Sequence, residues 1–224
     1  SALAAAIISE AVGVEKVLTI NMPTIYNSNT TQDLARQCAS NLGVEYKVLP
    51  IQTLYQEQLN MLESLELDNV SMLKKKNIQA RIRGAEIAAI SSYYGGVFTN
   101  NGNKTECALN YFTLYGDASG AASIFGDLWK GQIYELARYF NKIKNREVIP
   151  SGIINIVPSA ELSGDQNVDE GKGDPIQYEY HDKLLRAFCE YRWDIEKVLQ
   201  EVLSGNFEES IGLPRNSLGK YFNS

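Results

Sequence analysis

The sequence has few of the residues on which many catalytic and metal sites depend. His181 is the only histidine, so a catalytic triad that needs histidine would have to use it, and the polar segment 180–183 around it predicts a solvated surface position instead. The cysteines are odd in number and widely spaced, without the spacing of metal ligands; they are Cys38, Cys107 and Cys189. We therefore expect free thiols in a reducing compartment and a cytoplasmic protein.

Long apolar runs and an excess of positive charge are also missing. No apolar run reaches the about 20 residues that a membrane-spanning helix needs, and the apolar residues 1–8 lack the basic leader of a signal peptide. The formal net charge is −6 at pH 7. Because binding to nucleic acid depends on many cationic contacts with phosphates, we expect neither nucleic acid nor a membrane as a partner. A small phosphorylated ligand needs only a local cationic site and is compatible with this charge.

The composition is that of an ordinary globular protein. Hydrophobic residues make up 44% of the chain and charged residues 21%. A chain of 224 residues is long enough for one well-buried domain. We therefore expect a single domain over residues 1–224, in which residues 176–224 form a mostly helical C-terminal extension.

Helical segments and apolar strands alternate in the first half of the chain. In order, the predicted elements are a buried helix over residues 1–12, a strand over 17–22, a helix that ends at Leu42 and a strand over 44–51. Either Thr30 or Thr31 can cap the second helix, and Gly43 suits the turn that ends it. This alternation predicts an α/β fold, an open parallel sheet with helices on both faces.

The second half contains further helices and one more short strand. The predicted elements are a helix over residues 77–94, a strand over 97–99, a helix capped by Asp127 that runs through Tyr139, and a mostly helical segment over 178–203. A spacing of four, three and four residues predicts a buried stripe on the first of these helices, formed by Ile78, Ile82, Ala85 and Ala89. The charged segment 61–76 predicts a solvated connection, and the segment 164–175, rich in Gly, Asp and Lys, predicts a mobile loop.

Polar and charged residues gather after the strand predicted over 97–99. Lys104 and Glu106 follow it among small amide side chains, and Lys130 comes later, in the first turn of a predicted helix. The helix dipole disfavours a cation at that position, which favours a function for Lys130 over a surface role. Ligands of open α/β sheets bind beyond the carboxyl ends of the strands. Because lysine suits phosphate and a carboxylate suits a hard cation, this mixture favours a polyanionic ligand that carries a metal ion.

Several motifs follow one another along the chain in a specific order. They are Asn77-Ile78-Gln79-Ala80-Arg81, Asn103-Lys104-Thr105-Glu106, Tyr111-Phe112-Thr113-Leu114-Tyr115-Gly116-Asp117, Asp127-Leu128-Trp129-Lys130 and Pro158-Ser159-Ala160-Glu161-Leu162. Together they resemble NAD synthetase, specifically the synthetase part of the glutamine-dependent form. The resemblance runs from Ser1 to about residue 170 and fades beyond about residue 187. Several motifs in order with near-constant spacing are more specific than any one of them.

The resemblance implies a Rossmann-type fold of the ATP pyrophosphatase superfamily, also described as adenine nucleotide alpha hydrolase-like. In that superfamily a Ser-Gly-Gly-x-Asp-Ser loop before a helix presents backbone N–H groups to the pyrophosphate. Ser1 resembles the last serine of this loop. We therefore expect the chain to be truncated at its N-terminus and to lack most of the phosphate loop.

The resemblance also implies roles for single residues. The implied ATP-binding residues are Ser1, Met22, Asn101, Lys130 and Ser159. The implied residues for deamido-NAD are Asn77, Arg81, Glu106, Tyr111, Phe112, Thr113 and Leu114. Lys130 and Glu106 are the implied catalytic residues, and Glu106 is the implied ligand of Mg²⁺. Asn101 stands where the family often has threonine, and Leu114 and Ala121 stand where the ammonia-only form has lysine and aspartate, which favours the glutamine-dependent form.

The implied reaction is the ATP-dependent amidation of deamido-NAD to NAD through an NAD–adenylate, with release of pyrophosphate and AMP. The ammonia would come from glutamine in an upstream nitrilase-like glutaminase domain, which this chain does not contain. The family's habit of pairing synthetase domains implies a homodimer. Two alternatives stay open: another amide-forming ATP pyrophosphatase such as GMP synthetase, and a non-catalytic nucleotide-binding module of the universal stress protein type.

Overall fold

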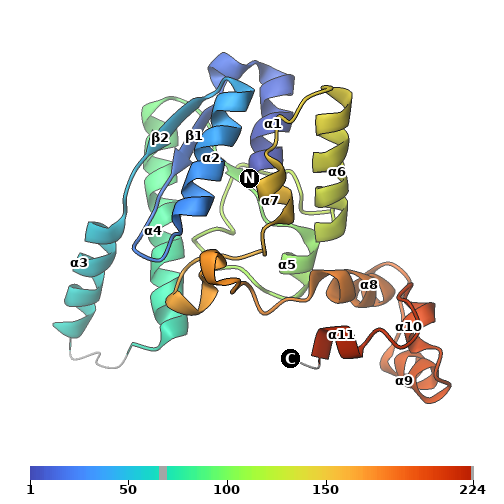
Figure 1. The fold of residues 1–224 in the computed structure, drawn as a ribbon. Coiled ribbons are helices and arrows are strands. Elements are labelled where there is room, and N and C mark those ends of the chain that lie inside the picture. Colours follow the sequence, from blue (N-terminus) through green and yellow to red (C-terminus); the bar gives the residue numbers. More distant parts are fainter. Residues whose placement is uncertain (66–69, 223–224) are drawn as a thin grey trace.

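Two pairs of parallel strands form the β-structure of the chain (Figure 1). The computed structural model describes residues 1–65 and 70–222. Within them, β1 (Leu18–Asn21) pairs with β2 (Glu45–Val48), and β3 (Thr99–Asn100) pairs with β4 (Ala122–Ser123). The predicted α/β class and parallel strand direction are confirmed, and the strands of the described part form two separate two-stranded sheets.

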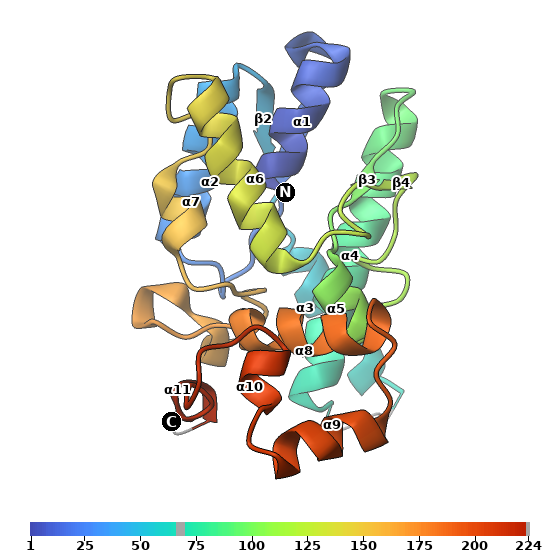
Figure 2. The ribbon, with the colours of Figure 1, turned by 90° about the vertical axis from the view of Figure 1, so that its right-hand side faces the viewer.

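Helices lie on both sides of the β1–β2 pair (Figure 2). On one side are α2 (Asn29–Leu42), α6 (Lys130–Ile143) and α7 (Ser151–Asn155), and on the other side is α4 (Met72–Tyr93). Ile20 of β1 packs toward α4, whereas Val17 and Val44 pack toward α2. Both faces of the strands are therefore covered by helices, as parallel strands require.

The start of α2 is fixed by contacts that the sequence did not predict. The hydroxyl of Ser28 accepts a hydrogen bond from the backbone N–H of Thr31 at 3.2 Å, so Ser28 is the N-cap and the predicted cap at Thr30 or Thr31 is wrong. The Glu161 carboxylate accepts two further bonds here, from the N–H of Ser28 at 3.1 Å and from the hydroxyl of Thr31 at 2.5 Å. The end of the helix is as predicted, because Gly43 takes up a left-handed conformation with φ of 75°.

The charged segment predicted as a solvated connection, 61–76, is largely helical at its two ends. α3 (Gln52–Glu63) extends into it and α4 begins at Met72, so the three lysines 74–76 lie on a helix. The remaining part, residues 66–69, lies outside the described residues. The predicted solvation is confirmed in the described part, since residues 61, 63–65 and 71–74 are exposed. The helical conformation was not predicted; lysine has a high helix propensity, and the run continues directly into the apolar repeat of α4.

The stripe predicted along α4 is confirmed in its first half only. Ile78 and Ile82 are buried against the cluster around Met22, whereas Ala85 and Ala89 are exposed. In the second half of the helix the side that faces the core passes to Ile87. The core contact of the second half therefore lies two residues after the predicted Ala85, and the small alanines face outward.

The β3–β4 pair lies later in the chain than the strand predicted over 97–99 and depends on a glycine. Gly120, with φ of 150°, passes so close to β3 that a Cβ there would lie 2.3 Å from the backbone nitrogen of Asn100. Only glycine fits this approach. β3 is followed at once by α5 (Lys104–Ala108), so the residues after the strand form the start of a short helix.

The helix predicted to be capped by Asp127 starts two residues later, with its N-cap at Trp129 and its first residue, that of α6, at Lys130. Asp127 is not its cap; its carboxylate accepts a hydrogen bond from the ammonium of Lys104 at 2.9 Å. The N-cap is Trp129, whose backbone N–H is bonded to the side chain of Gln132 at 2.9 Å. Lys130 lies in the first turn of the helix, as predicted.

Two hydrophobic clusters stabilise the strand region. One joins α1 (Ala2–Val12) to α6 and the segment before α7; its buried residues are Leu3, Ala4, Ala6, Phe125, Ala137, Phe140, Val148 and Ile149. The other joins the end of β1 to α3 and α4; its buried residues are Met22, Ile51, Tyr55, Leu59, Ile78 and Ile82. A short 3₁₀ helix, η1 (Val14–Lys16), connects α1 to β1.

The C-terminal quarter is mostly helical and has a cluster of its own. It contains η2 (Gly164–Gln166), η3 (Val168–Glu170), α8 (Tyr178–Cys189), α9 (Ile195–Leu203), α10 (Phe207–Ser210) and α11 (Gly219–Phe222). The buried residues of this cluster are Ala187, Phe207, Ile211, Leu213 and Tyr221. The predicted loop over 164–175 contains the two 3₁₀ turns, and the helix predicted over 178–203 is divided into α8 and α9.

The free cysteines agree with the sequence analysis. All three cysteines are free thiols; Cys38 is buried, and Cys107 and Cys189 are exposed. In the two described ranges, no helix has the length and apolar character needed to cross a membrane.

Candidate active site

Glu106 and Lys130 lie together where α5 and α6 begin. The ammonium of Lys130 is 3.4 Å from Oε1 of Glu106, and each side chain is about one-fifth exposed, at 21% and 20%. Glu106 also closes a capping box: its Oε2 accepts from the N–H of Asn103 at 3.0 Å, and its own N–H donates to the side chain of Asn103 at 3.0 Å. One carboxylate oxygen thus holds the helix start, and the other faces the lysine.

Tyr178 of α8 completes this pair, and the sequence analysis did not identify it. The Lys130 ammonium lies 4.8 Å from the centre of its ring, within the range of a cation–π contact. Its hydroxyl lies 3.4 Å from both Oε1 of Glu106 and Oδ2 of Asp174. Burial, followed by the charges of Glu106 and Asp174, raises the pKa of Tyr178, so the hydroxyl stays protonated at neutral pH and can donate a hydrogen bond to these carboxylates. Tyr178 lies beyond the motifs of the resemblance, which is why they gave no signal for it.

Asp174 anchors the loop that leads into α8. Its Oδ1 accepts from the hydroxyl of Tyr111 at 2.9 Å, the side-chain amide of Gln166 at 3.0 Å and the backbone N–H of Ala160 at 3.0 Å. Burial and then the charge of Asp174 raise the pKa of Tyr111. The tyrosine hydroxyl is therefore held inside this network, which connects the segment 164–175 to the predicted substrate segment.

A second group of predicted residues lies along α4. Asn77 and Arg81 share one side of the helix, as their spacing predicts. Oδ1 of Asn77 accepts from the hydroxyl of Thr113 at 2.8 Å, and Nε of Arg81 donates to the carbonyl of Leu114 at 3.2 Å. The loop approaches α4 so closely that a Cβ at Gly116 would lie 2.9 Å from the backbone of Ala80. The structure thus brings Asn77, Arg81, Thr113 and Leu114 together, with Phe112 half-buried beside them in the chain.

The other predicted ATP-binding residues differ in their exposure and in the groups that they contact. Ser1 is exposed and lies directly before α1. Met22 has its side chain in the hydrophobic cluster. Asn101 is exposed and accepts a hydrogen bond from Thr99 at 3.1 Å. The hydroxyl of Ser159 donates to the carbonyl of Gln166 at 2.6 Å and is thus held within its own loop.

Arg83 is a buried cation that the sequence analysis did not single out. Its Nε donates to the carbonyl of Met22 at 3.0 Å and its Nη2 to the side chain of Asn27 at 3.3 Å. Burial lowers the pKa of its guanidinium to about 10, and the charges of Asp117 and Glu161 act in the opposite direction. Arg83 therefore ties α4 to the end of β1.

Glu106 is the predicted site residue that could bind a metal ion. Within residues 1–65 and 70–222, no group of three or more His, Cys, Asp or Glu side chains is placed to enclose a metal ion. Mg²⁺ is commonly bound by one or two carboxylates together with waters and substrate phosphates. A single accessible carboxylate beside a lysine fits a Mg²⁺ ion that arrives with a nucleotide, and it does not form a closed structural metal site.

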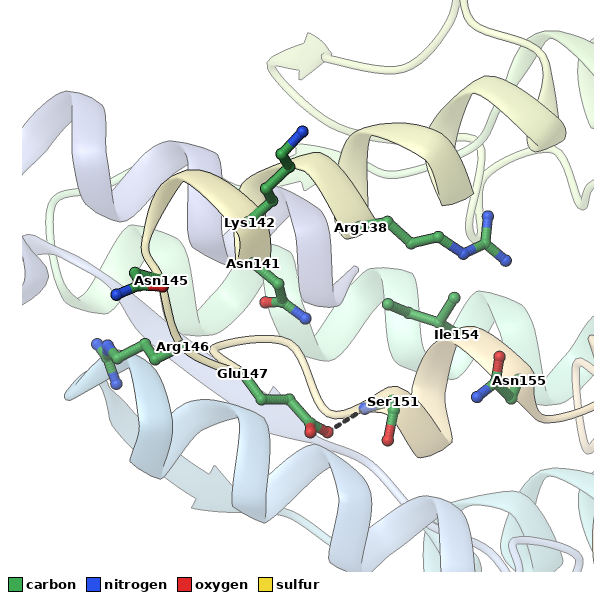
Figure 3. Close-up of a pocket in the computed structure, with 9 residues that line it drawn as sticks. All are labelled: Arg138, Asn141, Lys142, Asn145, Arg146, Glu147, Ser151, Ile154 and Asn155. Carbon is green, nitrogen blue, oxygen red and sulfur yellow. Dashed lines mark hydrogen bonds between the residues drawn. The ribbon is translucent and has the colours of Figure 1, made fainter.

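A separate groove of about 460 Å³ lies at the other end of α6 (Figure 3). Three cationic side chains, those of Arg138, Lys142 and Arg146, surround it. The carboxylate of Glu147, which is bonded to the backbone N–H of Ser151, partly offsets their charge. None of the predicted site residues lines this groove, so the candidate active site is the region around Glu106 and Lys130.

Comparison with known proteins shows the family of the chain. A family model described as NAD synthase matches residues 1–211. The "Glutamine-dependent NAD(+) synthetase" of Thermotoga maritima is 35% identical over 88% of this chain and 34% of its own length. The "NH(3)-dependent NAD(+) synthetase" of Chlorobaculum tepidum is 31% identical over 94% of this chain and 71% of its own length.

A solved structure gives the same result for the fold. Glutamine-dependent NAD+ synthetase from Acinetobacter baumannii, in complex with ADP, superposes with a TM-score of 0.67 at 26% identity. The match covers 95% of this chain and 40% of that one. The chain thus spans about a third of the length of the glutamine-dependent relatives.

Proposed function

The chain belongs to the NAD synthase family, and from this premise we propose that it amidates deamido-NAD to NAD at the expense of ATP. In the first step the nicotinate carboxylate attacks the α-phosphate of ATP, which releases pyrophosphate and leaves an NAD–adenylate. In the second step ammonia attacks the carbonyl carbon and AMP leaves. The family assignment favours this reaction over that of GMP synthetase and over a non-catalytic stress-protein module.

The contact between Lys130 and Glu106 is the observation that carries the proposal. Substitution at phosphorus needs little covalent chemistry from the protein, so catalysis depends on positioning and on cations that offset the developing charge. The partly exposed ammonium of Lys130 can approach the phosphates of ATP. The Oε1 oxygen of Glu106 that now faces Lys130, at 3.4 Å, can turn to the substrate or the metal.

Glu106 would hold the Mg²⁺ that accompanies ATP. A bound Mg²⁺ offsets the negative charge of phosphate oxygens. The residues of this chain do the rest: Lys130 pairs with the phosphates, and Tyr178 keeps the lysine near Glu106. The remaining ATP contacts that we propose are Ser1, Met22, Asn101 and Ser159.

The loop against α4 forms the proposed site for deamido-NAD. Arg81 is its cation, and a guanidinium can hold a phosphate or a carboxylate through two hydrogen bonds. Its Nε is bonded to a carbonyl of the loop, which leaves the terminal nitrogens for a substrate. The other proposed contacts are Asn77, Tyr111, Phe112, Thr113 and Leu114.

We further propose that ammonia comes from glutamine through an upstream nitrilase-like glutaminase domain. The Thermotoga maritima relative and the solved structure from Acinetobacter baumannii carry the glutamine-dependent name, and Leu114 and Ala121 depart from the ammonia-only pattern. We propose a cytoplasmic homodimer as the working form.

Product analysis tests the reaction. The full-length protein, incubated with MgATP, deamido-NAD and ammonium, should give AMP and pyrophosphate in equal amounts with NAD. With deamido-NAD present and ammonium omitted, it should exchange labelled pyrophosphate into ATP, and xanthosine monophosphate should not support this exchange. ADP as the nucleotide product would overturn the mechanism, because attack at the α-phosphate cannot give ADP.

A further inference from the structure

Asp182 of α8 links the starts of α5 and α6 through its two carboxylate oxygens. Oδ1 accepts from the hydroxyl of Thr105 at 2.5 Å, and Oδ2 accepts from the backbone N–H of Gly131 at 2.7 Å. The Thr105 oxygen in turn accepts from the backbone N–H of Lys130 at 3.2 Å. These four residues form one continuous network, in which Asp182 lies 51 positions after Gly131 and 77 positions after Thr105.

The two elements joined in this way carry the two proposed catalytic residues. Thr105 directly precedes Glu106 in α5, and Gly131 directly follows Lys130 in α6. A shift of one helix start against the other would change the distance between the ammonium of Lys130 and the carboxylate of Glu106. Misplacement of a reacting group by about 1 Å is enough to cost large factors in rate.

The network is buried at Thr105 and depends on a carboxylate. Thr105 is fully buried, with 0% exposure. Water therefore cannot replace Asp182 as the acceptor for its hydroxyl. The backbone N–H of Gly131 can only donate, and a carboxylate offers only acceptors. An asparagine could keep its Oδ1 on Gly131 only by turning its NH₂ group toward Thr105. This would replace the charge-assisted bond that the Thr105 hydroxyl donates by a neutral bond in the opposite direction.

We propose that Asp182 is a positioning residue of the synthetase reaction, which holds Lys130 at its working distance from Glu106. The inference rests on the proposed function of that pair. It assigns to α8 a part in the active site, although the sequence around Asp182 predicts only a polar surface segment. Tyr178, one turn earlier on the same helix, touches the same lysine and adds to this part.

The first test replaces Asp182 by Asn in the full-length protein. Exchange of pyrophosphate into ATP with deamido-NAD should fall about 10- to 100-fold in kcat/KM, as is usual for residues that orient a catalytic group. The melting temperature should change little, because the side-chain volume is kept. Glu179→Gln is the matched control: it removes a carboxylate from the same helix whose partner is Lys220, and it should leave the exchange unchanged.

A double-mutant cycle separates positioning from general loss of structure. MgATP affinity, measured by calorimetry, should weaken in Asp182→Asn and in Lys130→Ala. In the Lys130→Ala background, Asp182→Asn should change the affinity by less than about threefold, since residues that act as a unit are non-additive. Equal effects of Asp182→Asn in both backgrounds would overturn the positioning role.

Thr105 supplies a second pair of variants should Asp182→Asn fail to fold. Thr105→Ser keeps the hydroxyl and should retain the exchange, whereas Thr105→Val keeps the shape and should lose it. Wild-type exchange in Asp182→Asn, or in Thr105→Val, would overturn the positioning role alone. An unsubstituted protein without exchange would overturn the proposed function as well, so the two failures are distinguishable.

Discussion

At the scale of residues, the Glu106–Lys130 pair has features of a functional contact. Its two side chains are about one-fifth exposed and 3.4 Å apart, and partly exposed ion pairs typically contribute only about 0–1 kcal/mol to stability. The helix dipole also opposes a lysine in the first turn of α6. Stability therefore gives little reason for the pair, whereas a phosphate ligand gives a clear one.

Glu106→Gln should abolish NAD formation and leave the fold intact. The amide oxygen of glutamine can still accept from the N–H of Asn103, so the capping box of α5 can persist. The charge that would face Mg²⁺ and substrate is lost. We expect activity below about a tenth of the wild-type value, which corresponds to about 1.4 kcal/mol of barrier. Steady-state NAD formation and thermal unfolding measure the two effects; a variant with more activity than this would argue against the role of Glu106.

Tyr178 should act mainly through its ring. Tyr178→Phe keeps the aromatic face beside Lys130 and loses the hydroxyl contacts, which are long at 3.4 Å. Tyr178→Leu loses the cation–π contact, which is typically worth about 0.5–2 kcal/mol. We expect the KM for ATP to stay near the wild-type value in the phenylalanine variant and to rise in the leucine variant. If both variants behave alike, the ring contact contributes nothing to the site.

At the scale of elements, α8 connects parts of the chain that the sequence keeps far apart. Besides Tyr178 and Asp182, it contributes Glu190, which follows directly after the helix. The Glu190 carboxylate accepts from the ammonium of Lys104 at 3.0 Å, from the indole N–H of Trp129 at 2.8 Å and from Arg186 at 2.6 Å. Residues of α8 thus contact both α5 and the cap of α6.

The contribution of Glu190 should depend on pH. Hydrogen bonds from Lys104 and Trp129 lower the pKa of its carboxyl from 4.5 to about 2 in the folded protein. A lowered pKa means that the folded state favours the charged form, so the stabilisation is fully present well above pH 4.5 and is lost as the pH falls toward 2.

We therefore expect Glu190→Gln to lower the melting temperature at pH 7. The difference from the wild type should narrow progressively below pH 4.5, as the wild-type carboxyl loses its advantage. Thermal unfolding of both proteins over a pH series measures this. A difference that stays constant from pH 7 down to the acid range would show that the charge of Glu190 is not the cause.

At the scale of the whole molecule, α4 ends in an uncovered apolar surface. The alanines 85, 88 and 89 are exposed, and close by Tyr93, Tyr94 and Val97 are 85%, 54% and 79% exposed. Small residues allow a helix to approach a partner closely, and exposed aromatic residues are frequent in protein interfaces. This surface supports the homodimer that we propose, with the second copy covering the same side of α4.

The protein should therefore sediment as a dimer at micromolar concentration. Ala89→Arg places a charged side chain in the middle of the surface and should shift the protein toward the monomer. Glu57, on α3 and also exposed, gives a control variant, Glu57→Arg, which should leave the dimer intact. A wild-type protein that sediments as a clean monomer would disprove the proposal.

The source of the amide nitrogen, ammonium or glutamine, is a second property of the whole molecule, besides the dimer. If the glutaminase is a separate domain, a synthetase region without it should form NAD from ammonium and should not use glutamine. Free NH₃ is the nucleophile, so the rate at fixed total ammonium should rise with pH as the pH approaches the pKa of ammonium. Product assays with each nitrogen source measure this, and efficient use of glutamine by the synthetase region alone would contradict the domain assignment.

The sequence by itself determined the local elements and the family. Apolar periodicity predicted α1, β1 and β2, Gly43 predicted the end of α2, and a spacing of four predicted that Asn77 and Arg81 share one side of α4. These properties depend on neighbours within a few residues, so a linear pattern contains them. The motif order that identified the family is likewise a property of the chain alone.

Only the tertiary structure decided which distant residues meet. Ser28 begins α2 with the help of Glu161, 133 positions away, and Tyr178, Asp182 and Glu190 reach α5 and α6 from the C-terminal part of the chain. Such contacts depend on how α8 packs across the starts of two helices, and no local period encodes that packing. The exposure of the second half of α4 also depends on tertiary packing. Whether a helix residue is buried depends on what covers the helix as well as on the residue itself.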